Sequence, residues 1–355
     1  MAPIVLSELS RRYRNGVEAV RDVRLEIPDG AICVLTGPSG AGKSTLLRLI
    51  ACREAPSSGT VEIGDAVSQS WRLGRPDVVE FADPKFLKGS RNLYDTMAEG
   101  LSARHLGKRE IEARILKAAD ELGLGPLLAR RFDAVSSGER ALAMLGRALA
   151  HQPRAIVLDE PFEGLDGARR AAMRRSLAAL KGAGTTIVIA ANDWGDALLL
   201  ADMLVVLDAG RLVASGPALA LYDRPPSAQA ARLMGDPPMN VLPVRANQTG
   251  LSLEDGTHFG AASVMTTATF GLLGVRPEAL FVVEEAAPAP AASFPLHVEH
   301  VERTGHETLA HGRVGPHPFA ARLAGRIEPP AVGPLKLGAR RDSLVMFDAA
   351  TGALV

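Results

Sequence analysis

Short, almost wholly apolar runs alternate with longer stretches of helical spacing over the first two-thirds of the chain. Residues 31–35, 156–158 and 186–190 are the clearest apolar runs, and residues 167–180 between the last two carry a helical pattern. Continuous apolar runs of this length are typical of strands buried on both faces of a parallel sheet. The alternation therefore predicts an α/β domain that extends to residue 235.

A block from about residue 88 to residue 150 interrupts this alternation. It is rich in Ala, Leu, Arg and Glu at helical spacing, and its clearest helix covers residues 110–122 and ends at Gly123. Glycine directly after the last periodic residue is a frequent helix stop, because it adopts left-handed backbone conformation without steric cost. We expect a helical subdomain inserted into the α/β core.

The pattern changes again towards the C-terminus. Short strand-like pieces, such as residues 250–253, 296–299 and 343–347, are separated by Gly and Pro and show little helical period. Many short strands with turn residues between them favour a small all-β barrel of the OB type over residues 236–355. Within this domain, the Ala- and Pro-rich residues 285–292 predict an extended connector.

The loop after the first apolar run matches the phosphate-binding pattern G-x-x-x-x-G-K-[ST] in full. Between a strand and a helix, such glycines let backbone N–H groups surround phosphate oxygens, and the helix N-terminus adds a favourable dipole. Lys43 is then placed to reach the β- and γ-phosphates of a nucleotide, and the Ser44 hydroxyl to bind Mg²⁺. The predicted nucleotide-binding residues of this loop are Gly37, Pro38, Ser39, Gly40, Ala41, Gly42, Lys43, Ser44 and Thr45.

A second apolar run ends in two carboxylates, Asp159 and Glu160. In a protein with a phosphate loop, the first acid at such a strand end helps to hold Mg²⁺, and the second orients or deprotonates the attacking water. The alternative is a solvated exit from the strand, and the complete phosphate loop upstream favours the catalytic interpretation. We therefore predict Asp159 as a metal ligand together with Ser44, and Glu160 as a catalytic residue.

Charge and composition narrow the function classes. Of the 355 residues, 40 are Lys or Arg and 40 are Asp or Glu, so a dominant nucleic-acid surface is not expected.

The two cysteines, Cys33 and Cys52, are expected to be small apolar packing residues in a reducing compartment. The N-terminus lacks the charged segment and long apolar run of a secretory leader, and no stretch is apolar enough to span a membrane. We expect a soluble chain that reaches a membrane only through a partner.

Two further segments complete a recognisable set of motifs. Residues 135–139 read Val-Ser-Ser-Gly-Glu, and residues 163–166 closely follow the strand that ends in the two carboxylates. With the phosphate loop, these segments resemble the nucleotide-binding subunit of ABC transporters. The resemblance places Asp166 in the D-loop of that family. It assigns the role of the LSGGQ signature, exerted on the nucleotide of a partner subunit, to Ser136, Ser137, Gly138 and Glu139.

The C-terminal segments sharpen the resemblance. Residues 239–240, 274–278, 301–308 and 347–352 look like pieces of the regulatory, TOBE-like barrel of importer ATPases of the maltose and glycerol-phosphate type. This resemblance implies ATP and Mg²⁺ as cofactors and a head-to-tail pair of nucleotide-binding subunits, homodimeric or heterodimeric. It also implies two integral membrane permease subunits, an indirect periplasmic solute-binding protein, and a sugar, polyol or glycerol-phosphate as solute. The resemblance places the subunit at the cytoplasmic face of the membrane. For the C-terminal domain, a generic β module is the alternative to the regulatory barrel.

Departures from the family pattern bear on turnover. Ala82 stands where a coupling-loop Gln is expected and has no amide to bind Mg²⁺ or water. Asn192 replaces the switch histidine as a second predicted catalytic residue; it donates a hydrogen bond but carries no charge. Ser137 replaces a signature Gly and Glu139 a Gln, which puts a Cβ and a negative charge beside the nucleotide. Two hypotheses stay open: an active ATPase with drifted accessory residues, and a weak subunit that pairs with a complete partner.

Other residues and functions receive plainer interpretations. Tyr13 falls where the family has an aromatic residue that stacks on adenine, and plain packing is an equal alternative. An ABC ATPase that acts on nucleic acid is a remote alternative, because the neutral charge and the single nucleotide domain argue against it. The histidines of the C-terminal domain follow no metal-ligand spacing and predict surface or turn positions. A solvated helix face is predicted for Arg169, Arg170, Arg174 and Arg175, with an interface patch as the alternative.

Overall fold

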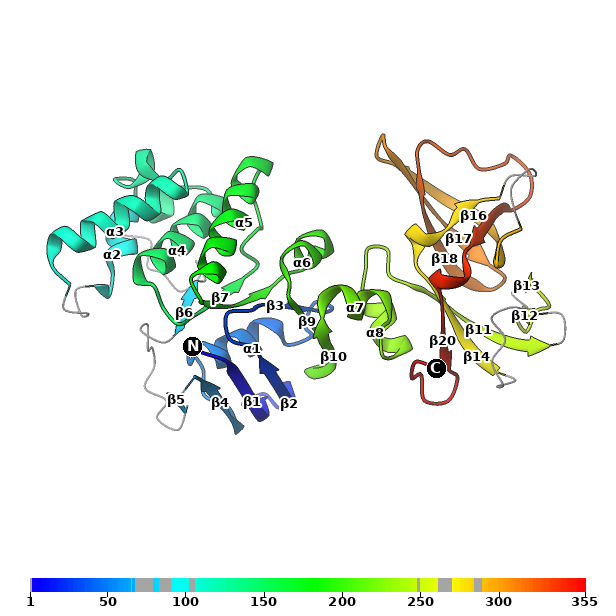
Figure 1. Ribbon diagram of the computed structural model, residues 1–355, viewed down its shortest axis with the longest axis horizontal. Coiled ribbons are helices and arrows are strands. Elements are labelled where there is room, and N and C mark those ends of the chain that lie inside the picture. Colours follow the sequence, from blue (N-terminus) through cyan, green and yellow to red (C-terminus); the bar gives the residue numbers. More distant parts are fainter. Residues whose placement is uncertain are drawn as a thin grey trace. The chain divides into compact units, whose positions relative to one another are not determined.

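The computed structural model describes residues 2–64, 66–67, 79–82, 91–101, 106–247, 250–260, 270–283 and 289–355 (Figure 1). Its internal contacts divide the chain into two compact units, Met1–Leu219 and Ala220–Val355. The first unit is a mixed α/β domain and the second is built mainly of antiparallel strands. The predicted fold class, a phosphate-loop α/β domain followed by a β domain, is confirmed.

The main sheet of the first unit has the strand order β10-β9-β3-β8-β7-β6. Neighbouring strands run parallel from β9 to β6, and β10 is antiparallel to β9. Every residue of β3 and β8 is buried, as expected for strands covered on both faces. The strands are β3 (Ile32–Thr36), β6 (Val79–Ala82), β7 (Ala155–Asp159), β8 (Thr186–Ala190), β9 (Met203–Asp208) and β10 (Arg211–Pro217).

A second, antiparallel sheet has the order β2-β1-β4-β5. One apolar cluster joins side chains of this sheet, of helix α1 (Lys43–Ile50) and of the parallel strands, so α1 is buried among them. The helix that begins at the phosphate loop therefore has little freedom to move away from the sheet that carries the carboxylates. The strands are β1 (Ile4–Arg12), β2 (Glu18–Ile27), β4 (Ser58–Ile63) and β5 (Ala66–Val67).

Three helices form the predicted helical subdomain. They are α2 (Leu93–Ala98), α3 (Lys108–Glu121) and α4 (Ser137–His151), and they contact one another. Helix α3 corresponds to the predicted helix over residues 110–122, and Gly123 follows it with a positive φ of 67°. Helices α5 (Gly167–Gly182) and α6 (Trp194–Leu200) belong to the α/β part of the unit. Figure 1 shows α2 to α5 grouped on one side of the parallel strands.

The second unit is a set of antiparallel strands around an apolar cluster. Phe294 is fully buried in this cluster, and its ring centroid lies 5.2 Å from that of Phe259 and 5.3 Å from that of Phe319. Part of the predicted connector over residues 285–292 lies outside the described residues. The strands are β11 (Asn240–Asn247), β12 (Gly250–Ser252), β13 (His258–Gly260), β14 (Phe270–Val275), β15 (Phe281–Val282), β16 (Ala292–Arg303), β17 (Glu307–Val314), β18 (His317–Ala324), β19 (Leu335–Ala339) and β20 (Leu344–Asp348).

The division between the units falls at residue 219, earlier than the expected boundary after residue 235. The reason is that α8 (Ala228–Leu233) shares an apolar cluster with residues of the β domain. Ala228 and Ala231 of α8 pack in it with Met239, Val345 and Phe347. Helix α8, which the sequence pattern assigned to the nucleotide domain, is therefore part of the second unit.

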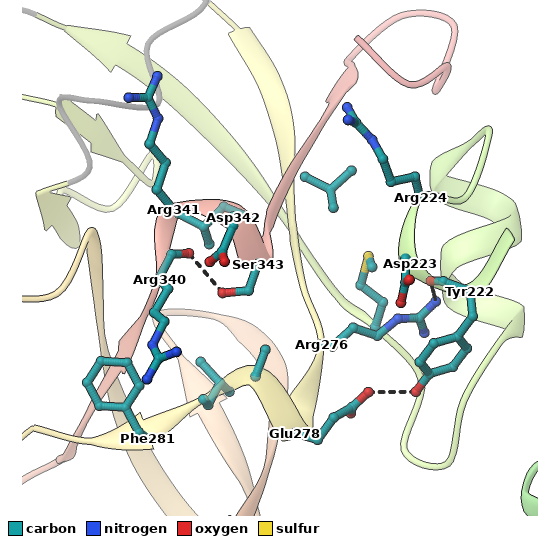
Figure 2. A pocket seen from close by; sticks show the side chains of 15 residues that line it. Tyr222, Asp223, Arg224, Arg276, Glu278, Phe281, Arg340, Arg341, Asp342 and Ser343 are labelled. Carbon is teal, nitrogen blue, oxygen red and sulfur yellow. Dashed lines mark hydrogen bonds between the residues drawn. The ribbon is translucent and has the colours of Figure 1, made fainter. Parts of the chain in front are cut away.

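Arg276 fastens the same segment to the β domain (Figure 2). Its guanidinium donates to the carbonyl oxygens of Tyr222 and Met234, at 2.5 Å each, and lies 3.8 Å from the Tyr222 ring centroid. The Tyr222 hydroxyl donates to Glu278 at 2.6 Å, and burial together with this bond raises the pKa of Tyr222. Tyr222 is the penultimate residue of α7 (Ala218–Asp223). The Gly-x-Arg-Pro-Glu segment thus ties residues 222–234 to the second unit, beside a cavity of about 1140 Å³.

Candidate nucleotide-binding and hydrolysis site

The phosphate loop connects β3 to α1, and its glycines are sterically required. Gly37 and Gly42 have φ values of 140° and 102°, in the region that favours glycine. A Cβ at Gly37 would lie 2.0 Å from the carbonyl oxygen of Leu207, and one at Gly42 would lie 2.2 Å from that of Ala19. The loop is therefore packed directly against neighbouring backbone, which fixes the direction of its N–H groups.

Lys43 is the first residue of α1 and is buried inside the loop. Its Nζ donates to the carbonyl oxygens of Gly37 at 2.6 Å and Pro38 at 3.1 Å. Burial lowers the pKa of Lys43, and the carboxylates of Glu160 and Asp159 act in the opposite direction. The ammonium group thus lies at the loop and within electrostatic reach of both carboxylates.

Asp159 is the last residue of β7, and Glu160 follows in a left-handed conformation with a φ of 48°. The backbone N–H of Glu160 donates to the carbonyl oxygen of Ala190 at the end of β8. Asn192, two residues beyond β8, donates its side-chain N–H to Glu160 Oε1 at 2.6 Å. The carboxyl ends of parallel strands meet at one edge of a sheet, and this edge is where the crevices of α/β proteins bind ligands. The structure therefore brings together Lys43, Asp159, Glu160 and Asn192.

A cavity of about 160 Å³ lies beside the Glu160 and Asn192 pair. Both residues line it, together with Phe162 and Asp193. A cavity of this size has room for ordered water, because one probe sphere occupies only about 10–15 Å³, and the Glu160 and Asn192 side chains offer it polar partners. The carboxylate that is predicted to act on water is thus next to a space that can hold it.

Tyr13 lies beside the phosphate loop with its hydroxyl fixed. That oxygen is 3.2 Å from Thr45 Oγ1 and donates to Glu54 at 3.1 Å, and Arg48 donates to it at 3.1 Å. The Arg11 guanidinium lies 5.0 Å from the ring centroid. These bonds hold the ring near α1 with a cation over it, so Tyr13 is packed as well as close to the loop. Stacking of adenine on Tyr13 stays a prediction.

The signature residues form the start of α4. Ser136 is the N-cap, and its side chain accepts a hydrogen bond from the Glu139 N–H at 3.2 Å. The Glu139 carboxylate accepts one from the Ser136 N–H at 2.9 Å, which completes a capping box. Asp166 is the N-cap of α5, and its carboxylate accepts a hydrogen bond from the Arg169 N–H at 2.8 Å. Ser136, Glu139 and Asp166 are therefore a second group of predicted residues, on two neighbouring helix N-termini.

Ala82 is the last residue of β6 and pairs with Leu158, next to Asp159 on β7. This register brings the backbone of the predicted coupling position to the same sheet edge as the carboxylates. Residues 83–90, which follow it, lie outside the described residues. The coupling role of Ala82 stays a prediction.

The arginine-rich face of α5 is only partly solvated. The side chains of Arg169, Arg170 and Arg174 are 31–42% exposed, and all three pair with carboxylates. Arg170 and Arg174 pair with the buried Asp196 of α6 at 2.6 and 2.5 Å. Arg169 pairs with Glu139 at 3.0 Å. Their partners lie on other helices, so periodicity along α5 gave no sign of them. Asp196, at the third position of α6, and Arg169 are functional candidates that the sequence pattern did not reveal.

The residues at the sheet edge fit a nucleotide with Mg²⁺. The phosphate loop offers backbone N–H groups and one buried ammonium to an anion. Ser44 and Asp159 offer only oxygen donors, which is the ligand chemistry that Mg²⁺ prefers. The crowding at Gly37 and Gly42 holds the loop against the backbone of Leu207 and Ala19.

Comparisons with known proteins show the family of the chain. The profile of the ABC transporter family matches residues 20–163. The sn-glycerol-3-phosphate import ATP-binding protein UgpC of Rhodopseudomonas palustris (strain BisB5) is 36% identical over 98% of each chain. UgpC 3 of Agrobacterium fabrum is 36% identical over 99% of each chain. The chain belongs to the ABC transporter ATP-binding proteins.

Solved structures share the fold of the first unit. The cbiO1 subunit of Clostridium perfringens is 26% identical, with a TM-score of 0.54 over 62% of this chain and 90% of that one. The dimeric cassette MJ0796, solved with ADP and Pi, is 23% identical, with a TM-score of 0.57 over 61% and 98%.

Membership of this family defines the activity in general terms. The chain is an ATP-binding subunit and an ATPase, and it couples ATP binding and hydrolysis to solute transport by an ABC transporter. Such subunits act in pairs and together with membrane permeases. Among the described residues, no helix has both the length and the apolar character that crossing a bilayer requires.

Proposed function

We propose that this subunit hydrolyses ATP to drive the import of a sugar, a polyol or glycerol phosphate. The relatives that align with nearly the whole chain are named as sn-glycerol-3-phosphate import proteins, which supports a solute of this class. The observation that carries the hydrolytic part is the convergence of Lys43, Asp159, Glu160 and Asn192 at one sheet edge.

Each of these residues has a role that its chemistry fits. The loop N–H groups and Lys43 bind the phosphates and offset the charge that develops during phosphoryl transfer. Ser44 and Asp159 hold Mg²⁺, which when bound supplies further charge neutralisation at the phosphates. Glu160 accepts a proton from the attacking water, and its distorted backbone and its bond to Asn192 fix the direction of its carboxylate.

Two subunits bind head to tail in this proposal. Ser136, Ser137, Gly138 and Glu139 of one subunit then contact the nucleotide that Lys43 of the other holds. Binding of ATP closes the pair, and hydrolysis releases it, which moves two permease subunits. The subunit works at the cytoplasmic face of the membrane, and a solute-binding protein outside delivers the solute.

A second candidate is a subunit that binds ATP tightly but hydrolyses it slowly, and that pairs with a complete partner. The bond from Asn192 to Glu160 favours this candidate. A donor that is already used by the general base is less available to the γ-phosphate. Ala82 adds no amide at this site.

Steady-state ATPase activity and nucleotide affinity of the purified chain decide between the candidates. The comparison includes Glu160→Gln, which removes the base, and Ala82→Gln/Asn192→His, which restores both family residues. We expect measurable turnover, and a loss of about 100-fold or more in Glu160→Gln. Tight ATP binding without turnover, together with a gain in the restored variant, would instead establish the slow subunit.

A further inference from the structure

The two unusual residues of the signature, Ser137 and Glu139, both face the segment that contains the D-loop. The Ser137 Oγ lies 2.7 Å from the position that a Cβ at Gly164 would take. A Cβ at Gly138 would lie 2.8 Å from the Gly164 carbonyl oxygen and 2.8 Å from a methyl carbon of Leu165. The start of α4 and residues 164–165 are therefore in direct contact, and the Ser137 side chain occupies space that the missing side chain of Gly164 leaves free.

Glu139 is connected to the same segment by charge. Its Oε1 accepts a hydrogen bond from the Arg169 guanidinium at 3.0 Å, while its Oε2 accepts from the Ser136 N–H at 2.9 Å. Arg169 in turn lies 3.6 Å from the Asp166 carboxylate and donates its backbone N–H to it at 2.8 Å. The Glu139 side chain is 16% exposed and that of Arg169 is 42% exposed, so the pair is partly shielded from water. Glu139, Arg169 and Asp166 thus link the N-termini of α4 and α5.

The capping box also determines which N–H and O–H groups of the signature remain available to bind an anion. It uses the backbone N–H groups of Ser136 and Glu139. The N–H groups of Ser137 and Gly138 and the Ser136 hydroxyl hydrogen are the groups at this terminus that suit an anion. The bond from Ser136 and the charge of Arg169 both lower the pKa of Glu139, so its carboxylate is ionised at neutral pH. Without a counter-charge, this carboxylate would repel a phosphate beside the same helix terminus.

We infer that Arg169 is a positioning residue that neutralises Glu139 and joins the signature to the D-loop. In the same region, Gly164 leaves the space that the Ser137 side chain needs. Gly164 thus compensates for Ser137, and Arg169 compensates for Glu139. The compensated signature remains able to bind the phosphates of a partner's nucleotide. This inference rests on the proposed head-to-tail pair, in which the signature acts in trans. It assigns to this chain a working signature despite two departures from the family pattern.

A double-mutant cycle in the full chain tests this inference. Its members are the native chain, Glu139→Gln, Arg169→Gln and the double variant, and Arg175→Gln on the exposed side of α5 is the matched control. Glutamine at position 139 keeps the side-chain oxygen of the capping box but removes the charge. The readouts are kcat, KM for ATP and the thermal midpoint.

We expect Arg169→Gln to lower kcat about tenfold when Glu139 is present and less than about twofold in the Glu139→Gln background. KM for ATP should stay within about twofold, because ATP first binds at the phosphate loop of the other subunit. Arg175→Gln should leave kcat unchanged. An equal loss from Arg169→Gln in both backgrounds, or a loss that follows the thermal midpoint, would overturn the inference.

A second measurement separates this inference from the proposed function. Sedimentation measures ATP-dependent dimerisation of the same four members of the cycle, each of which also carries Glu160→Gln. We expect Arg169→Gln to weaken the ATP-dependent dimer about tenfold only when Glu139 is present. If the native chain shows no turnover but the dimer follows this pattern, the hydrolytic proposal fails and the inference stands. If turnover is present and dimerisation is insensitive to Arg169, the inference fails alone.

Discussion

At the scale of single residues, the site depends on contacts that each hold one functional group in place. Asn192 holds the Glu160 carboxylate, and two backbone carbonyls hold Lys43. The motif spacing predicted that Lys43, Asp159 and Glu160 act together, because a complete phosphate loop followed by a strand that ends in two acids is specific to nucleotide sites. The bond between Asn192 and Glu160 was not predictable, because β8 and β7 are neighbours only in the folded sheet.

Replacing Asn192 tests this bond. In Asn192→Ala we expect kcat to fall about tenfold, because the carboxylate loses the donor that orients it. KM for ATP should change by less than about twofold, since the phosphates bind at the loop. Steady-state kinetics check this, and Asn192→Asp is a further comparison that places a second negative charge beside Glu160. Unchanged kcat in Asn192→Ala would show that Glu160 needs no such support.

The crowding of the phosphate loop gives a second prediction at this scale. Gly42→Ala should abolish ATP binding, because its Cβ would lie 2.2 Å from the Ala19 carbonyl oxygen. Gly123→Ala, outside the loop, is the matched control: its φ of 67° is also positive, but nothing lies within 4 Å of its Cβ position. We expect Gly123→Ala to cost about 1 kcal/mol of stability from backbone strain alone and to retain binding. Equilibrium ATP titration and thermal unfolding of both variants measure these effects, and equal losses would contradict the role assigned to crowding.

At the scale of secondary-structure elements, apolar periodicity predicted the parallel strands β3, β7 and β8 and the helix α3 closely, but not β6 or β9. It did not reveal the antiparallel sheet of β1, β2, β4 and β5, because strands that are half exposed carry a weaker pattern than strands buried on both faces. It also did not reveal that Arg169, Arg170 and Arg174 of α5 find partners on α4 and α6. Charge along one helix does not show whether another helix supplies the counter-charge.

The N-terminus of α4 leads to a prediction about pH. The pKa of Glu139 is lowered from its ordinary 4.5, first by the Ser136 N–H and also by Arg169 and Arg130. A carboxylate with a lowered folded-state pKa adds stability above the unfolded value, and this stability is lost as the pH falls through the folded value. Glu139→Gln should therefore have a lower urea midpoint than the native chain at pH 7. Urea unfolding at several pH values should show the difference shrinking below pH 4.5; a constant difference would mean that charge is not its source.

At the scale of the whole molecule, the contacts place residues 220–234 with the β domain. The sequence placed them with the nucleotide domain, because short helices resemble the elements that precede them. Side-chain packing decided otherwise, through Ala228 and Ala231 and through the buried guanidinium of Arg276. The Gly-x-Arg-Pro-Glu segment, which resembles the importer family, thus has a structural role in this chain.

Removing this guanidinium should loosen the segment. In Arg276→Met, the carbonyl oxygens of Tyr222 and Met234 lose their donors, and we expect a loss of about 2–4 kcal/mol in stability. Chemical denaturation measures the loss, and limited proteolysis should show new cleavage within residues 220–238. Arg326→Met, at an exposed position of the same unit, is the control and should stay within about 0.5 kcal/mol of the native chain. Equal stability of the two variants would contradict the fastening role.

The nucleotide-binding class and the fold class could be predicted from the amino-acid sequence. Both depend on local order along the chain: a loop of fixed spacing, a strand that ends in two acids, and the period of apolar residues. Tertiary structure alone decided which charges are compensated, where the units divide and what Asn192 contacts. These depend on pairs such as Glu139 with Arg169 and Asn192 with Glu160, which are about 30 residues apart in the chain. The physical reason is that hydrogen bonds and ion pairs depend on distance in space, and only the packed sheets and helices set that distance.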